Sequence, residues 1–147
     1  MSNPSKAKGT ASESAVVKLA QSFGLTAERR ALRRAADEGD VWIDGGRIVI
    51  EVKSRRKPWT WTEIDKWMRE AEREAEHSPT CDAAVLVVKR VGSGAANAGD
   101  WLAWITVSDL NFIAAPKGHH VTATYCPDQR VMLPLGDLLA AYVGGRR

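Results

Sequence analysis

The segment 41–53 limits what this chain can fold into more than any other part of its sequence. It reads VWIDGGRIVIEVK: two runs rich in β-branched residues, separated by the pair Gly45-Gly46. Two such runs around a two-residue glycine turn predict a β-hairpin. With a turn of that length the pairing runs outward in a defined register, and Asp40 comes to face Glu51 across the two strands.

This register sorts the hairpin side chains onto two faces, because side chains alternate along a strand. One face receives only apolar, β-branched side chains and is predicted to be core: Val41, Ile43, Ile48, Ile50 and Val52. The other face receives a mixed set: Asp40, Trp42, Val49, Glu51 and Lys53. A slip of one residue would send Asp40 and Glu51 to different faces, so any site built from both depends on the register.

Asp40 and Glu51, opposed in this way, would have β-carbons roughly 5 Å apart. Two carboxylates at that separation disfavour the sheet unless positive charge lies between them. Lys53 on the same face supplies some of this charge, and a divalent cation such as Mg²⁺, commonly held by one or two carboxylates and waters, could supply more. The residues alone leave two interpretations open: a metal site, or an exposed strand face on which Lys53 pairs with a carboxylate.

The rest of the chain predicts alternating helices and strands. We expect helices at 10–24, 60–75, 108–115 and 135–143, and strands at 83–88, 101–107 and 121–126, with 25–39 ambiguous. Thr10 and Thr60 each precede a glutamate by three residues, which is the spacing of a capping box. The element order predicts the α/β fold class, a mixed sheet with helices packed against it, in a single domain over residues 10–147. Residues 1–9 are polar and basic and are predicted to be a disordered tail.

A resemblance to a known family rests on the same hairpin. Asp40 followed by Glu51-Val52-Lys53, with an upstream helix that carries Glu13, resembles the signature of the PD-(D/E)xK nuclease superfamily. A longer set of segments, KGTASESAVVKLAQSFG, AERRAL, DEGDVW and IVIEVKS, is similar to the Holliday junction resolvases of phages of actinobacteria. The similarity covers residues 8–54 and continues weakly beyond them. Gly39 replaces the proline of the superfamily's usual Pro-Asp pair.

The resemblance implies a restriction-endonuclease-like core, a central mixed β-sheet flanked by helices, and hydrolysis of phosphodiester bonds in branched DNA. It implies that Asp40, Glu51 and the backbone carbonyl of Val52 hold Mg²⁺, with Mn²⁺ able to substitute. Lys53 would orient or activate the attacking water, and Glu13 would assist at the metal. Glu13 has a second explanation, because it also occupies the capping-box position of its own helix.

Clustered basic residues are expected to contact the DNA backbone beside this site, although the net charge is only +3. The candidates are Arg29, Arg30, Arg33, Arg34, Ser54, Arg55, Arg56, Lys57, Lys89 and Arg90. The simpler alternative is a solvated helix or loop surface. Trp59, within a basic loop, is expected to pack in the core, and stacking on an unpaired base is its alternative role.

Resolution of a four-way junction needs paired, symmetric cuts, so the resemblance also implies a homodimer. The apolar stripe of the helix at 60–75 is a candidate dimer surface. Two other functions stay open: a restriction-like, nicking or repair endonuclease on duplex or flap DNA, and a non-catalytic DNA-binding module. They differ in whether cutting occurs and on which DNA.

The expected location is the cytoplasm, that of the host if the chain is phage-encoded. No stretch is apolar for long enough to span a bilayer, and the start MSNPSKAKGTASES lacks the apolar segment of a signal peptide. Cys81 and Cys126 have no spacing typical of zinc, and we expect both to be reduced. We therefore expect no membrane partner and no small-molecule cofactor.

Overall fold

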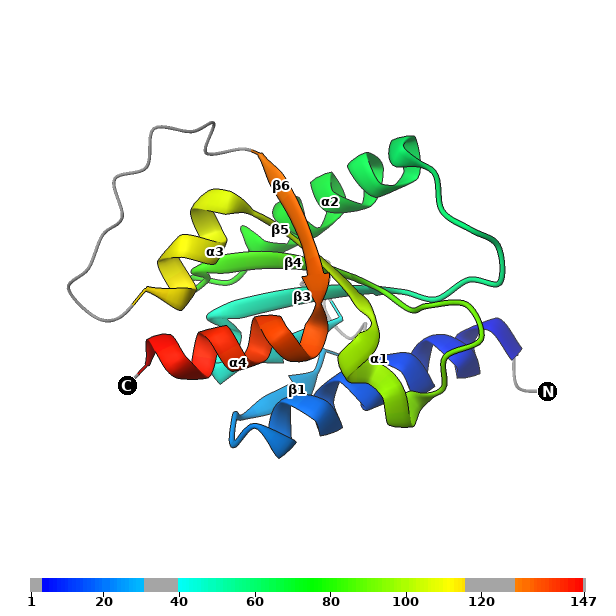
Figure 1. Ribbon diagram of the computed structural model, residues 1–147, viewed down its shortest axis with the longest axis horizontal. Helices are drawn as coiled ribbons and strands as arrows, with labels where there is room; N and C mark the ends of the chain where they lie inside the picture. Colours follow the sequence, from blue (N-terminus) through cyan, green and yellow to red (C-terminus); the bar gives the residue numbers. More distant parts are fainter. Residues whose placement is uncertain (1–3, 31–39, 116–128, 147) are drawn as a thin grey trace.

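The computed structural model describes residues 4–30, 40–115 and 129–146, which form one mixed sheet with helices on both faces (Figure 1). The strands are β1 (Ala27–Arg29), β2 (Val41–Ile43), β3 (Ile48–Lys53), β4 (Ala83–Val88), β5 (Leu102–Thr106) and β6 (Arg130–Pro134). The helices are α1 (Pro4–Ser22), α2 (Trp61–Ala75), α3 (Val107–Ala114) and α4 (Leu135–Gly145), with 3-10 turns η1 (Asp44–Gly46) and η2 (Ala95–Asp100). This is the predicted mixed α/β architecture, and it is consistent with a restriction-endonuclease-like core.

The six strands follow one another across the sheet in chain order. Among the described strands β3 and β4 run parallel, and every other neighbouring pair is antiparallel. A parallel pair cannot be joined by a tight turn, because the chain must return to the starting edge of the sheet. Helix α2 makes that return, and it therefore lies across the two central strands.

The register of the hairpin is confirmed. Val41 pairs with Ile50, Trp42 with Val49 and Ile43 with Ile48. Residues 44–46 form a 3-10 turn, slightly wider than the predicted two-residue loop but with the same offset between the strands. Because the offset is the same, the side chains fall on the two faces that the sequence predicted.

The face predicted to be core packs against α1, α3 and α4. Its central members are Val41, Ile43, Ile48 and Ile50, all with no solvent exposure. The opposite face packs against α2, where Ile64 and Met68 contact Leu86, Val88 and Trp104. Strand β4 is buried along its whole length, as its continuous apolar run predicted. Both faces of the sheet are therefore covered.

Two helix starts differ from prediction. Helix α1 begins at Pro4, so residues 4–9 are helical and do not belong to the predicted disordered tail. Thr10 lies inside the helix instead of capping it. Ala and Lys in this stretch are good helix formers and let the helix extend. Helix α3 is capped by Thr106, whose hydroxyl accepts from the N–H of Asp109 (3.1 Å), and not by Ser108.

Helix α2 begins as predicted. The Thr60 hydroxyl accepts from the N–H of Glu63 (3.3 Å), and the Glu63 carboxylate accepts from the N–H of Thr60 (2.9 Å), which is a complete capping box. The apolar stripe of α2 packs against the sheet, where Ile64 and Met68 are buried. Trp61 is the exception, with 69% of its surface exposed. Most of the stripe considered as a dimer surface is thus internal.

The structure has a strand, β6, that the sequence did not predict. The predicted strand at 121–126 lies outside the described residues, and the strand that pairs with β5 is β6, through Leu102↔Pro134 to Thr106↔Arg130. The final helix, α4, agrees with prediction. None of the described helices has the length and apolarity needed to cross a membrane.

Cys81 is half-buried and its thiol is free, donating to the carbonyl of Ala83 (3.3 Å). Cys126 lies outside the described residues, so the reduced state of both cysteines stays a prediction.

Candidate active site

Asp40 lies immediately before β2, at the point where the ladder between β2 and β3 ends. Its backbone N–H donates to the carbonyl of Ile50 (3.0 Å), and its carboxylate accepts from the backbone N–H of Val52 (2.7 Å). The Asp40 carboxylate therefore accepts the hydrogen bond from β3 that a backbone carbonyl of β2 would accept if the ladder continued. Glu51 lies between the two β3 residues that Asp40 holds, so the two carboxylates are neighbours. They are neighbours through this side-chain contact and not as a regular cross-strand pair.

Glu51 and Lys53 project from β3 toward α2. Glu51 is buried, with 7% of its surface exposed, and its Oε1 lies 2.7 Å from the Nζ of Lys53. The same Nζ lies 3.0 Å from Oε2 of Glu70 on α2. Glu74, one turn further along α2 and equally buried, hydrogen-bonds to Glu51. Lys53 is thus held between two carboxylates, one from its own strand and one from the crossover helix.

The site contains more acidic than basic side chains, and the pKa values of its carboxyl groups are raised. Burial, and next the charge of Glu51, raise the pKa of Asp40 to about 7, against the hydrogen bond from Val52, which lowers it. Burial, and next the hydrogen bond with Glu74, raise the pKa of Glu51 to about 8. Burial lowers the pKa of Lys53, but its hydrogen bonds to Glu51 and Glu70 outweigh burial, and the net shift is upward.

Glu13 lies close enough to Asp40 for its charge to raise the pKa of that carboxyl. It does not cap α1, because the helix starts earlier. Its Oε2 instead accepts two hydrogen bonds from Arg29, from Nε (2.8 Å) and Nη2 (2.6 Å), and Arg29 also donates to the hydroxyl of Thr10 (3.3 Å). Glu13 therefore sits at the border of the site with one oxygen engaged by an arginine.

Two members of the site were not singled out from the sequence, Glu70 and Glu74. Their spacing of four residues puts them on one side of α2. In the sequence they belong to an acidic run between Glu63 and Glu76 that looks like a solvated helix face. The only signal is that Glu74 lies between Ala71 and Ala75, which are buried.

The donor set suits a hard divalent cation. Asp40 and Glu51 offer carboxylate oxygens, and the Val52 carbonyl leaves the strand on the same side as the N–H that binds Asp40. Mg²⁺ takes such oxygens and completes its shell with water. Within the described residues no cluster of three or more His, Cys, Asp or Glu side chains is arranged to hold a metal, so these two carboxylates would act with backbone and water ligands.

The first group of basic residues is largely engaged within the protein. Arg29 is paired with Glu13, as above. Arg30 lies over the ring of Trp42, 3.9 Å from its centroid, and pairs with Glu28 (2.8 Å). Arg33 and Arg34 lie outside the described residues. Their contact with DNA stays a prediction.

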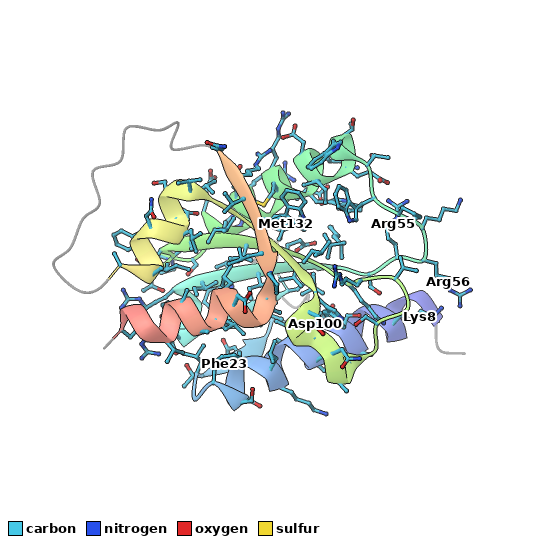
Figure 2. All side chains as sticks on the ribbon, viewed as in Figure 1. Lys8, Phe23, Arg55, Arg56, Asp100 and Met132 are labelled. Carbon is cyan, nitrogen blue, oxygen red and sulfur yellow. The ribbon has the colours of Figure 1, made fainter. Side chains whose placement is uncertain are left out.

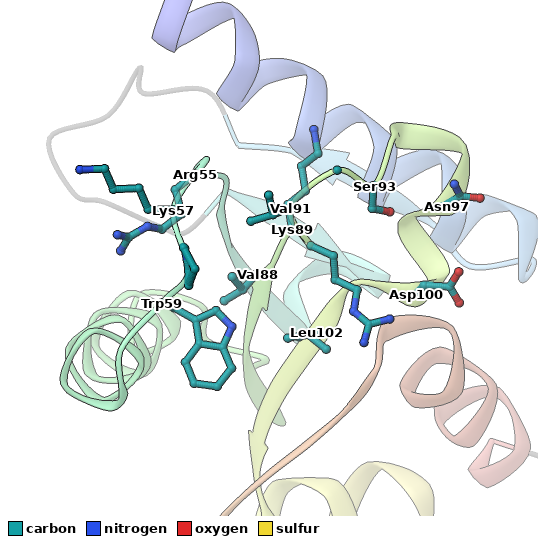
Figure 3. Close-up of a pocket in the computed structure, with 13 residues that line it drawn as sticks. Arg55, Lys57, Trp59, Val88, Lys89, Val91, Ser93, Asn97, Asp100 and Leu102 are labelled. Carbon is teal, nitrogen blue, oxygen red and sulfur yellow. The ribbon is translucent and has the colours of Figure 1, made fainter.

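The second group follows β3 directly. Ser54, Arg56 and Lys57 are exposed, as is Arg90 at the end of β4. Figure 2 shows Arg55 and Arg56 projecting from the loop between β3 and α2. Arg55 pairs with Glu63 and lies 5.7 Å from the ring of Trp67, while Lys89 lies 5.7 Å from the ring of Trp101. Of this group, Arg55, Lys57, Lys89 and Arg90 line a hollow at the ends of β3 and β4, drawn in Figure 3.

Comparisons with known proteins add no family. No family model matches the chain, and searches of curated proteins and of solved structures gave no significant match.

Proposed function

We propose that this chain is a Mg²⁺-dependent DNA endonuclease, with Asp40, Glu51 and Lys53 as its catalytic residues. The observation that carries the proposal is the meeting of these three side chains at the end of β3. The buried carboxylate of Glu51 and the half-buried carboxylate of Asp40, both with raised pKa values, lie beside a lysine that Glu51 and Glu70 hold in place. Strongly shifted acids grouped around one cation are more typical of functional sites than of structural ion pairs.

Asp40, Glu51 and the carbonyl of Val52 are the groups that would hold the metal. Mg²⁺, when bound, polarises a phosphoryl oxygen and lowers the pKa of a coordinated water. The Val52 N–H fixes the Asp40 carboxylate before any ligand arrives (2.7 Å). A metal ligand that is already fixed does not have to reorganise during the reaction. Such preorganisation is a main source of electrostatic catalysis.

Lys53 acts as a charged donor. Its Nζ lies against Glu51 and Glu70, and such pairing favours the ammonium form. An ammonium group cannot accept a proton, so Lys53 would orient the attacking water and stabilise the charge that develops on the phosphoryl oxygens. Glu70 is the residue that positions it.

The substrate, branched DNA such as a four-way junction, and a homodimeric assembly rest on the resemblance of residues 8–54 to the resolvases. A restriction-like, nicking or repair endonuclease would use the same three residues on duplex or flap DNA. A non-catalytic module would bind junctions without cutting them. Mn²⁺ is expected to replace Mg²⁺ in either enzyme.

The test is incubation of labelled four-way junction, flap and linear duplex DNA, at equal concentration, with the protein and Mg²⁺. Wild type is expected to cut the junction best, and Asp40→Asn and Lys53→Ala are expected not to cut. The matched controls are Asp137→Asn and Lys66→Ala, exposed residues on α4 and α2. Equal cutting by the wild type and the two site variants would contradict the proposed active site. Binding of the junction without cutting, in Mg²⁺ or Mn²⁺, would support the non-catalytic DNA-binding module instead.

A further inference from the structure

A basic hollow of about 590 Å³ opens beyond the C-terminal ends of the parallel strands β3 and β4 (Figure 3). Its lining contains four basic side chains, Arg55, Lys57, Lys89 and Arg90, against one acidic side chain, Asp100. Figure 3 shows Arg55 and Lys57 on one side of the hollow and Asp100 on the other. The excess of positive charge predicts an anionic ligand.

The hollow adjoins the candidate active site along the backbone of β3 and β4. The carbonyl of Lys53 accepts a hydrogen bond from the backbone N–H of Lys89 (2.9 Å), so a site residue and a lining residue are directly joined. Arg55 follows Lys53 by two residues, a span of no more than about 7 Å. One edge of the hollow therefore lies beside the candidate active site.

One wall of the hollow is aromatic and fixed. Trp59 lines it, and its ring makes edge contacts with Trp61 (centroids 5.2 Å apart) and Trp104 (5.6 Å). Trp104 is buried in the sheet, so the indole of Trp59 is anchored to the core. The sequence left Trp59 between a core role and a stacking role, and in the structure the ring both packs on the core and borders the hollow.

We propose that this hollow binds one unpaired nucleotide of the DNA, with its phosphate against Lys57, Lys89 and Arg90 and its base against Trp59. The proposal rests on the proposed function, because it assumes a DNA substrate. The volume is within the range of about 300–1,000 Å³ that small-molecule sites occupy, and a phosphate alone needs no aromatic wall. A paired base keeps both faces in the stack, so a base can reach a recessed indole only when it has left the stack.

The assignment explains a preference for branched or distorted DNA through this chain's own residues. Base–aromatic stacking does not depend on sequence, because every base has a π face. The hollow would therefore select for an unpaired nucleotide near the cut, and not for a base sequence.

The test measures binding and not cutting. Fluorescein-labelled duplexes, with and without a one-nucleotide bulge, are titrated with protein in EDTA and followed by anisotropy. Trp59→Leu is expected to weaken binding to the bulged duplex by about 5- to 100-fold, the loss typical of one base–aromatic stack. Binding to the fully paired duplex is expected to stay within about twofold. Trp61→Leu is the matched control, since Trp61 belongs to the same aromatic cluster but does not line the hollow.

Two outcomes overturn the proposal. If Trp59→Leu weakens binding to both duplexes equally, the hollow is a general contact for the DNA backbone. If it weakens binding to neither, the hollow has no role in DNA binding. If Trp59→Leu fails to fold by far-UV circular dichroism, Arg90→Glu decides, with Lys66→Glu as its control; both residues are exposed. A loss with Arg90→Glu that is larger on the bulged than on the paired duplex supports the proposal, and an equal loss or no loss overturns it.

The binding result is separable from the nuclease assay. A wild type that binds bulged DNA through Trp59 but cuts nothing refutes the proposed function and leaves the hollow assigned. A wild type that cuts in Mg²⁺, with binding that does not respond to Trp59 or Arg90, refutes only the hollow.

Discussion

The carboxylate of Asp40 accepts a hydrogen bond from the backbone N–H of Val52 at 2.7 Å, across the place where β2 stops and β3 continues. A side chain thus takes over the pairing that the backbone of β2 gives up. This contact fixes the first acid of the site beside Glu51, and it makes the carboxylate part of both the fold and the proposed chemistry.

We predict that Asp40→Asn separates these two roles. The amide oxygen of asparagine can still accept from the Val52 N–H, so the fold is expected to persist. The loss of a charged metal donor is expected to reduce the cutting rate at least about 100-fold. Single-turnover cutting and thermal melting measure the two effects. A variant that cuts at the wild-type rate contradicts the metal role of Asp40, and Asp137→Asn controls for loss of a surface charge.

Glu70→Gln tests whether the crossover helix positions Lys53. Removing this charge leaves Lys53 paired with Glu51 alone, so we expect a fall in cutting rate of about 3- to 30-fold, with unchanged DNA affinity. Lys53→Ala is expected to lose far more activity. The comparison variant is Glu76→Gln at the end of the same helix, which should have no effect. A change in DNA affinity without a change in rate would contradict positioning.

The stability of the metal-free protein is expected to fall as the pH rises. The folded pKa values of Asp40, about 7, and Glu51, about 8, lie above the ordinary values of 3.8 and 4.5, so the folded state binds more protons. The stabilisation is complete below about pH 4 and is lost as the pH rises through about 7 and 8. Melting temperatures across this window measure it.

Two additions test the cause of that decline. The double variant Asp40→Asn with Glu51→Gln is expected to flatten the pH profile. Mg²⁺ is expected to raise the melting temperature more at about pH 8 than at about pH 5, because protonated acids bind metal poorly. A Mg²⁺ effect of the same size at both values would show that these acids do not hold the ion.

Gly46→Ala is expected to destabilise the protein by roughly 2–4 kcal/mol in urea unfolding. A β-carbon there would lie 2.4 Å from the Oγ of Ser78 and 2.8 Å from the ring of Trp42, at a φ of +92°. Gly45→Ala is the control, since it has a φ of +68° but nothing within 4 Å, and only the left-handed strain of about 1–2 kcal/mol applies. Equal effects of the two substitutions would argue against the steric explanation.

The central part of the fold was predictable because its signals are local. Gly45-Gly46 and the β-branched runs around them define the hairpin, and the register they set is the one observed. The capping box of Thr60 and Glu63 marks the start of α2 in the same way. The start of α1 was missed because Thr10 and Glu13 have capping-box spacing inside a longer helix. Strand β6 is short, ends in Pro134 and lies at the edge of the sheet, where it pairs with β5. Its sequence therefore shows no clear alternation of apolar and polar residues.

Only those site residues that lie close together in the sequence could be predicted. Asp40, Glu51 and Lys53 belong to one hairpin. Alternation along β3 puts Glu51 and Lys53 on one face, and the hydrogen bond from the Val52 N–H holds the Asp40 carboxylate near them. Glu70 and Glu74 could not be found, because they reach Lys53 and Glu51 only after α2 has crossed the sheet. The pairing of Glu13 with Arg29 was missed for the same reason: it depends on how α1 packs beside β1, and no spacing in the sequence encodes that distance.

The crossover through α2 has a consequence for the order in which the molecule becomes competent. A newly made chain can form the hairpin with its two acids as soon as residue 53 is available, because these contacts are local. Lys53 gains its contact with Glu70 only when α2 has packed against β3, and the hollow gains Lys89 and Arg90 only when β4 has paired with β3. Parallel pairing through a long crossover is a late and slow step of folding. The proposed nuclease would therefore gain its activity only with the completed sheet.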